Sequence, residues 1–178
     1  PNAVRLDQYN NPLNVEAHYW GTGREIWEQT KGDIDYFVCG GSTGGTVTGV
    51  SRFLKERSDK VKVVLCDPAG SSMSNAFHTG SYEPSPGSTQ IEGIGKNYKV
   101  ECFDPSVLDD VLPVSDRDAF MTARRMAQEE GILCGISSGA NVWSALELAR
   151  QATVPTNIVT VLPDGGSKYL SKLFNPQW

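Results

Sequence analysis

The sequence predicts an α/β fold, a three-layer arrangement in which a parallel sheet carries helices on both of its faces. Two short apolar runs, 35–39 and 61–67, flank an amphipathic stretch at about 45–57, and a glycine-rich turn joins the first run to that stretch. This order is typical of a βαβ unit. The chain has 178 residues, of which 39% are hydrophobic, so we expect a single domain over 1–178 with a core of its own.

The segment before the first strand divides into a loop and a helix. Residues 1–14 are rich in Asn, Asp and Gln and contain two prolines, which predicts a connecting loop. Apolar residues then recur at helical spacing over 16–29, but Gly21 and Gly23 interrupt the pattern. We therefore predict a helix that begins at about Gly23.

A long segment without periodicity follows the second strand. Residues 71–99 are rich in Ser, Gly and Pro, and a loop of this length inside a compact domain is usually functional or disordered. Within it, Ile91-Glu92-Gly93-Ile94-Gly95 places two glycines around an isoleucine. Glycines at such positions let a backbone approach a ligand closely, so 91–95 is a candidate binding loop.

The rest of the chain continues the alternation. Order resumes at 110–114, and a serine followed by acidic residues predicts a helix over 115–130. A second glycine–serine turn, 135–139, opens a helix at about 139–151, and a last strand is expected at 157–162. Two strand–turn–helix elements thus present small polar residues at strand ends, which predicts a ligand site at the carboxyl edge of the sheet.

Composition and charge exclude several classes of function. The net charge is −5 and the basic residues are scattered, so the sequence has no basic patch for nucleic acid or an anionic membrane. No apolar run approaches the length of a membrane span. The four cysteines lie far apart without a C-x-x-C pair, which favours free core thiols in a reducing compartment. His18 and His78 are the only histidines, so no metal site is expected, and we predict both to be solvated or structural.

The glycine-rich turn predicts a phosphate site. Residues 42–46, Ser-Thr-Gly-Gly-Thr, join a strand to a helix, so backbone N–H groups and the positive helix end can surround an anion. The spacing lacks the three glycines of a dinucleotide fingerprint, and Thr46 stands where a P-loop has lysine. A small phosphomonoester held by amides and hydroxyls fits the turn. An ordinary glycine-rich turn without a ligand is the alternative.

Four motifs occur in the order found in one enzyme family. The turn continues as Ser42-Thr43-Gly44-Gly45-Thr46-Val47-Thr48-Gly49, and after it come the 91–95 loop, the 135–139 turn and the ending from Leu162 to Trp178. With these motifs the chain resembles the pyridoxal-phosphate enzymes of fold type II, most closely cystathionine β-synthase and cysteine synthase. The resemblance covers nearly the whole chain. Ser42 departs from the family turn, which begins with glycine.

The resemblance implies pyridoxal 5′-phosphate as the cofactor. Its phosphate would lie on the 42–46 turn, and a serine hydroxyl would bond the pyridine nitrogen. A hydroxyl there, unlike a carboxylate, leaves the ring a weaker electron sink, which favours loss of a β-substituent. The 91–95 loop would lie against the amino-acid substrate. The implied residues are Ser42, Thr43, Gly44, Gly45, Thr46 and Ser137 for the cofactor, and Gly93, Ile94 and Gly95 for the substrate.

The resemblance also implies that this stretch carries no catalytic residue. In the family, the lysine that forms the Schiff base precedes the matching stretch, and no lysine here lies in an S-x-K-x-R context. That amine would also move the proton at the substrate α-carbon. We therefore expect the chain to be the C-terminal part of the catalytic core, inactive alone, with the N-terminal part of the core as its partner.

Several functions stay open on the sequence. The ending favours cystathionine β-synthase, which joins L-serine and L-homocysteine in transsulfuration, as a cytoplasmic homodimer by family likeness. The alternatives are cysteine synthase, which acts on an activated serine with sulfide, and a non-catalytic homologue or partner that retains the fold. Other fold type II activities, such as threonine dehydratase or the tryptophan synthase β-subunit, agree less well with that ending.

Overall fold

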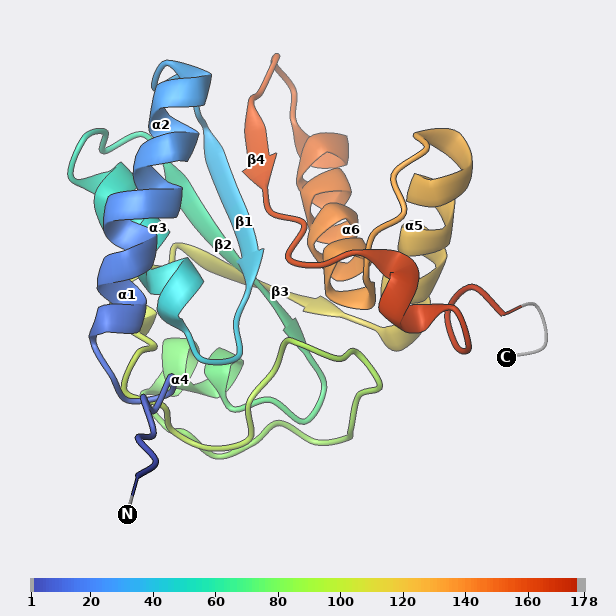
Figure 1. Ribbon diagram of the computed structural model, residues 1–178. Coiled ribbons are helices and arrows are strands. Elements are labelled where there is room, and N and C mark those ends of the chain that lie inside the picture. The colour runs from blue at the N-terminus through green and yellow to red at the C-terminus, as the bar shows by residue number, and fades with distance from the viewer. Residues whose placement is uncertain (1, 176–178) are drawn as a thin grey trace.

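A computed structural model of the chain describes residues 2–175 (Figure 1). Its described residues form a four-stranded parallel sheet in the order β3-β2-β1-β4. The strands are β1 (Tyr36–Gly40), β2 (Lys62–Pro68), β3 (Asp110–Val114) and β4 (Ile158–Thr160). The expected parallel α/β sheet is confirmed. Pro1 and residues 176–178 lie outside the described part of the chain. Residues 176–178 belong to the ending from Leu162 to Trp178.

Helices cover both faces of the sheet, as the sequence predicted (Figure 1). The first layer contains α1 (Leu13–Ala17), the π-helical turn η1 (His18–Gly23), α2 (Arg24–Thr30) and α3 (Gly45–Lys55). The opposite layer contains α5 (Asp116–Glu129) and α6 (Ile136–Gln151). Three short elements complete the described chain: α4 (Met73–Thr79), η2 (Pro105–Val107) and η3 (Gly166–Tyr169). No described helix is both long and apolar enough to cross a membrane.

The central strands are buried on both faces. Val63 and Leu65 of β2 belong to a core cluster with Val50 of α3, whereas Cys66 belongs to a second cluster with Ile136 of α6. Alternate residues of one strand therefore meet helices on opposite faces. A strand covered on both faces is apolar along its length, which explains the continuous run in the sequence.

The first helical segment begins earlier than the sequence suggested. It starts at Leu13, and Gly21 and Gly23 lie inside the continuous helical path that η1 forms between α1 and α2. The prediction of a start at Gly23 was therefore wrong. A Cβ at Gly23 would lie 2.9 Å from Cβ of Phe53, so this glycine permits helix packing instead of ending a helix. Tertiary contact here outweighs the low helix propensity of glycine.

Two further boundaries differ from the expectation. The helix expected from 139 begins at Ile136, so most of the 135–139 turn is the first turn of α6. Within the unpatterned 71–99 segment, α4 forms a short helix. The earlier start of α6 agrees with packing that a local pattern does not contain. A Cβ at Gly139, for example, would overlap the Ala119 carbonyl oxygen of α5, so glycine lets the two helices meet.

The segment α1–η1 packs directly on α3 because α3 has a glycine at the contact. A Cβ at Gly49 would overlap the carbonyl oxygen of Val15 and would lie 2.9 Å from Cβ of His18. Because the carbonyl oxygen of Val15 is a backbone atom, it cannot move out of the way as a flexible side chain could. The glycine that ends the Thr-Gly-Gly-Thr-Val-Thr-Gly motif therefore sets the distance between these two helical segments.

We predict that Gly49→Ala lowers the free energy of unfolding by about 1–3 kcal/mol, because it overpacks this contact. Gly21→Ala is the matched control, since a Cβ at Gly21 would meet no atom within 4 Å. Alanine there is expected to leave stability unchanged or raise it by up to about 1 kcal/mol. Urea denaturation of both variants measures the difference, and equal effects would contradict the packing argument.

Candidate functional site

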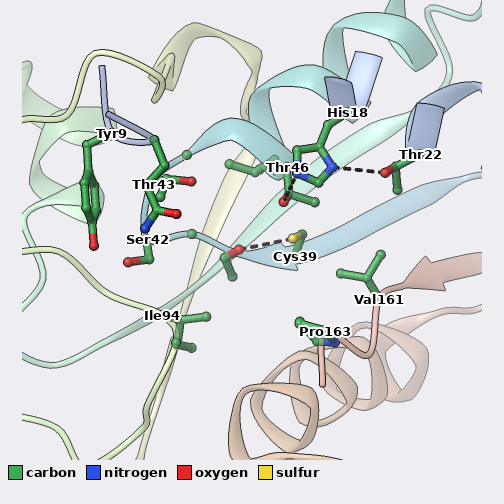
Figure 2. Close-up of a pocket in the computed structure, with 16 residues that line it drawn as sticks. Tyr9, His18, Thr22, Cys39, Ser42, Thr43, Thr46, Ile94, Val161 and Pro163 are labelled. Carbon is green, nitrogen blue, oxygen red and sulfur yellow. Dashed lines mark hydrogen bonds between the residues drawn. The ribbon is translucent and has the colours of Figure 1, made fainter. Parts of the chain in front are cut away.

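A cavity of about 550 Å³ opens at the carboxyl edge of the sheet, where β1 and β4 end (Figure 2). From β1 the chain leads through α3 to β2, whereas it reaches β4, on the other side of β1, only after α5 and α6. The strand order therefore reverses between β1 and β4. In open parallel sheets ligands bind at such a switch point, which is the edge that the sequence indicated.

The first turn of α3 leaves backbone donors unpaired in this cavity. The N–H of Gly45 donates to Thr43 Oγ1 at 3.3 Å. The other N–H groups of this stretch have no acceptor among the described residues, and all of their residues line the cavity: Ser42, Thr43, Gly44, Thr46 and Val47. Unpaired N–H groups at a helix N-terminus form a binding site for an anion.

The turn requires glycine at one position and accepts serine at another. Gly44 has φ of 86°, and a Cβ there would lie 2.5 Å from Cα of Phe103. Ser42 is not among the described non-glycine residues with positive φ. Serine in place of the family glycine therefore causes no left-handed strain. The Ser42 hydroxyl lines the cavity and forms no hydrogen bond with the described residues, which leaves it free to donate.

His18 lies at the cavity with both ring nitrogens engaged (Figure 2). Nε2 is 3.1 Å from Thr46 Oγ1, and Nδ1 is 3.0 Å from Thr22 Oγ1. Burial lowers the pKa of His18 below its usual value, which favours the neutral ring. The sequence suggested a solvated or structural histidine, because nothing local connects position 18 to the turn at 46.

The 91–95 loop lies against the glycine-rich turn. The N–H of Gly95 donates to the carbonyl oxygen of Gly41 at 2.7 Å, and Gly93 and Ile94 line the cavity. Gly95 itself is outside the cavity lining, and a Cβ there would lie 2.7 Å from Cγ of Pro68. Of the residues implied for the substrate, two therefore reach the cavity and one attaches the loop to the sheet edge.

Ser137 lies directly behind Gly93. It belongs to the first turn of α6 and is 3% exposed. A Cβ at Gly93, whose φ is 97°, would lie 3.5 Å from Ser137 Oγ. Ser137 is not itself part of the lining, and its hydroxyl forms no hydrogen bond with the described residues. The structure thus brings the 42–46 turn and the 135–139 turn to the same edge of the sheet, with the 91–95 loop between them.

Asn141 connects α6 to the end of β1 and to the segment that follows β4. Its Oδ1 accepts from the N–H of Gly40 at 2.8 Å, and its Nδ2 donates to the carbonyl oxygen of Val161 at 2.9 Å. The side chain is fully buried. Asparagine can make both bonds because one amide carries an acceptor and a donor. Sequence reasoning missed this residue, which looks like one more polar position in a helix.

Cys39 lies at the end of β1 in the cavity wall, where a nucleophile could be suspected. Burial, with a smaller contribution from Cys66, raises the pKa of the Cys39 thiol to about 12. The thiol therefore stays protonated at neutral pH and does not serve as a nucleophile. All four cysteines are buried and free, as their spacing predicted. Sequence reasoning also missed other lining residues that come from distant segments: Gln8, Tyr9, Thr22, Val161 and Pro163.

Three comparisons with known proteins agree on one family. The family model described as "Pyridoxal-phosphate dependent enzyme" matches residues 1–164. Cystathionine beta-synthase of Apis mellifera is 40% identical over 182 residues, which cover 100% of this chain and 35% of the relative. Cysteine synthase A of Escherichia coli K12 is 43% identical over 169 residues, covering 93% of this chain and 52% of the relative.

A solved structure of O-ureido-L-serine synthase superimposes with a TM-score of 0.87 at 38% identity. The match covers 97% of this chain and 53% of that structure. The chain therefore spans between about a third and about half of the length of the proteins that it matches. Its fold is that of the corresponding part of those proteins.

We predict that Asn141→Leu lowers the free energy of unfolding by about 2–4 kcal/mol, because it leaves the Gly40 N–H and the Val161 carbonyl without partners. Asn97→Ala is the control, since Asn97 is exposed, and its effect should stay within about 0.5 kcal/mol. Thermal or urea unfolding measures both variants. A loss below about 1 kcal/mol for Asn141→Leu would contradict the role of this side chain.

A second prediction concerns Asp67, at the carboxyl end of β2. Its Oδ2 accepts from the N–H of Ser74 at 3.0 Å, while the buried Oδ1 has no partner among the described residues. Burial raises the pKa of Asp67 to about 6, above the value of about 3.9 expected in the unfolded chain. Its contribution to stability is therefore fully present below about pH 4 and declines as the pH rises through about 6.

Asp67→Asn removes this titration. Between about pH 4 and pH 7.5, the unfolding free energy of the wild type should fall relative to that of the variant by about 3 kcal/mol, which corresponds to two pKa units. Urea denaturation across this pH range measures the change. Asp59→Asn, at an exposed position, controls for the loss of one negative charge. A difference that stays constant with pH would refute the prediction.

Proposed function

Because this chain belongs to the family of pyridoxal-phosphate dependent enzymes, we propose that it is the C-terminal part of the catalytic core of a β-replacement enzyme. Pyridoxal 5′-phosphate is the cofactor that this membership implies. The specific activity proposed is that of cystathionine β-synthase, which joins L-serine and L-homocysteine. We further propose that its substrates are small amino acids and that it acts as a homodimer in the cytoplasm, as the family likeness implies.

The unpaired donors at the start of α3 carry this proposal. The backbone N–H groups of five residues that line the cavity have no acceptor among the described residues: Ser42, Thr43, Gly44, Thr46 and Val47. A phosphate oxygen is the acceptor that such a helix terminus favours. On the far side of Gly93 the Ser137 hydroxyl is also free. The unpaired amides suit a phosphomonoester, and a free hydroxyl such as that of Ser137 suits a single acceptor atom, such as a ring nitrogen.

Each group of residues then has one task. The amides of the turn, with the hydroxyls of Ser42 and Thr46, bind the phosphate, and Ser137 donates to the ring nitrogen. When bound, the cofactor withdraws electrons from the substrate α-carbon, so that a proton and then a β-substituent can leave. The apolar side chains of Ile94 and Val161 line the same cavity and reduce the access of water to the reacting atoms.

The amine for covalent attachment is proposed to come from the N-terminal part of the core. No lysine lines the cavity within the described part of the chain. A lysine from that other part would attach the cofactor and move the proton at the substrate α-carbon. This chain alone is therefore proposed to bind the cofactor without turning over substrate.

Two alternatives remain beside this proposal. The identities of 40% to a cystathionine beta-synthase and 43% to a cysteine synthase are too close to separate the two activities. Cysteine synthase would require O-acetylserine and sulfide as substrates. A non-catalytic homologue would retain the fold and the phosphate site without either activity.

Product analysis on the protein that combines this chain with the N-terminal part of the core tests the proposal. Cystathionine formed from L-serine and L-homocysteine is the expected result. Cysteine formed only from O-acetylserine and sulfide would assign cysteine synthase instead. Cofactor binding without either product would assign a non-catalytic homologue, and the absence of cofactor binding would reject the proposal altogether.

Ser137→Ala gives a sharper test of the site. We expect turnover to fall by about tenfold or more, because one hydrogen bond to a group that changes charge is lost, while the cofactor stays bound. Ser171→Ala is the control, since Ser171 is exposed, and should turn over like the wild type. Unchanged turnover in Ser137→Ala, with cofactor bound, would remove Ser137 from the proposed site.

A further inference from the structure

His18 connects two hydroxyl groups across the wall of the cavity. It is the first residue of the π-helical turn η1, and the same turn carries Thr22. Its two ring nitrogens lie 3.0 Å from Thr22 Oγ1 and 3.1 Å from Thr46 Oγ1. Figure 2 shows the ring between the two threonines, and all three residues line the cavity. Single π-helical turns are frequent at functional sites.

The ring is held in place from outside the cavity. Gly49 lets η1 approach α3 closely: a Cβ built at Gly49 would lie 2.9 Å from Cβ of His18. Neither Thr22 Oγ1 nor Thr46 Oγ1 has another hydrogen-bond partner among the described residues. Burial lowers the pKa of His18, which favours a neutral ring with one donor and one acceptor nitrogen.

Two arrangements of protons are consistent with these distances. If Nε2 carries the proton, it donates to Thr46 Oγ1, and the Thr46 proton is free to point at an anion. If Nδ1 carries the proton, the Thr46 hydroxyl donates to Nε2 and presents only lone pairs to the cavity. An anion on the first turn of α3 attracts a hydroxyl proton and repels lone pairs. The first arrangement is therefore the one that an anion selects.

We propose that His18 is a positioning residue that keeps the Thr46 hydroxyl proton directed at the bound phosphate, and that the Thr22 hydroxyl holds the ring in the required tautomer by donating to Nδ1. This inference rests on the phosphate site proposed above and adds Thr22 and His18 to it. Which nitrogen carries the proton is set by the hydrogen bond that the other nitrogen makes. The relay Thr22–His18–Thr46 thus presents one hydroxyl donor to the bound phosphate.

The tautomer of His18 can be measured directly in this chain. Only His18 and His78 are present, so ¹⁵N-histidine labelling yields two pairs of ring-nitrogen signals, and His78→Gln assigns them. With pyridoxal 5′-phosphate bound, we expect a neutral His18 with its proton on Nε2. Thr22→Ser should keep this tautomer, whereas Thr22→Val should lose the preference because Nδ1 loses its donor.

Ligand affinity gives an independent test. Equilibrium dialysis with pyridoxal 5′-phosphate should show binding weakened about three- to tenfold in Thr22→Val, because Thr46 is no longer held as a donor. Binding of pyridoxal, which lacks the phosphate, should not change. Thr30→Val is the control, since the Thr30 hydroxyl donates to the Ile26 carbonyl within α2 and lies outside the cavity lining. It should bind both ligands like the wild type.

The outcomes separate this inference from the proposed function. A proton on Nδ1 with the ligand bound, or equal losses for pyridoxal and its phosphate in Thr22→Val, would overturn the relay and leave the cofactor site intact. If wild-type protein fails to bind pyridoxal 5′-phosphate, the proposed function and the relay are both rejected. Should Thr22→Val fail to fold, the tautomer of ligand-bound His18 in the wild type still decides the question, because a proton on Nδ1 would overturn the relay.

Discussion

The candidate site depends on a group of backbone donors that have no acceptor among the described residues. The first turn of α3 leaves the N–H groups of Thr46 and Val47 unpaired, together with those of the preceding turn. Unpaired backbone N–H groups are rare in folded proteins because each costs free energy when it is removed from water. Here they gather where β1 and β4 diverge, so an anionic group with several oxygens is the ligand that satisfies them.

The glycines of the Thr-Gly-Gly-Thr motif perform two different tasks. Gly44 adopts a left-handed conformation and turns the chain into α3. Gly49 has no such requirement and instead allows the backbone of Val15 to approach α3. A motif that is usually interpreted as a phosphate loop therefore also brings the first helical segment to the cavity. Without that approach, His18 would not reach Thr46.

The two ends of the site are held together by contacts between distant segments. Asn141 joins the end of β1 to the segment after β4, and the N–H of Gly95 attaches the 91–95 loop to Gly41. That loop in turn places Gly93 beside Ser137. The separation between the phosphate turn and Ser137 is thus determined by buried hydrogen bonds, which are costly to break.

The sequence by itself determined the order and type of most elements. Continuous apolar runs predicted β1 and β2, and the serine and acidic residues at 115–118 predicted the start of α5, because these signals are local. The glycine-rich turn likewise indicated an anion site, since its spacing and its position before a helix are both visible in the chain.

Only the tertiary structure decided where the first helix begins and which side chains complete the cavity. Glycines at 21 and 23 predict a break in the helix. The segment stays helical, and Gly23 packs against Phe53 of α3. His18 bonds a residue 28 positions away, and Asn141 bonds one 101 positions away. Such pairs follow from how the layers stack, and no periodicity or spacing along the chain records them. Local patterns determine elements, whereas contacts between elements determine the site.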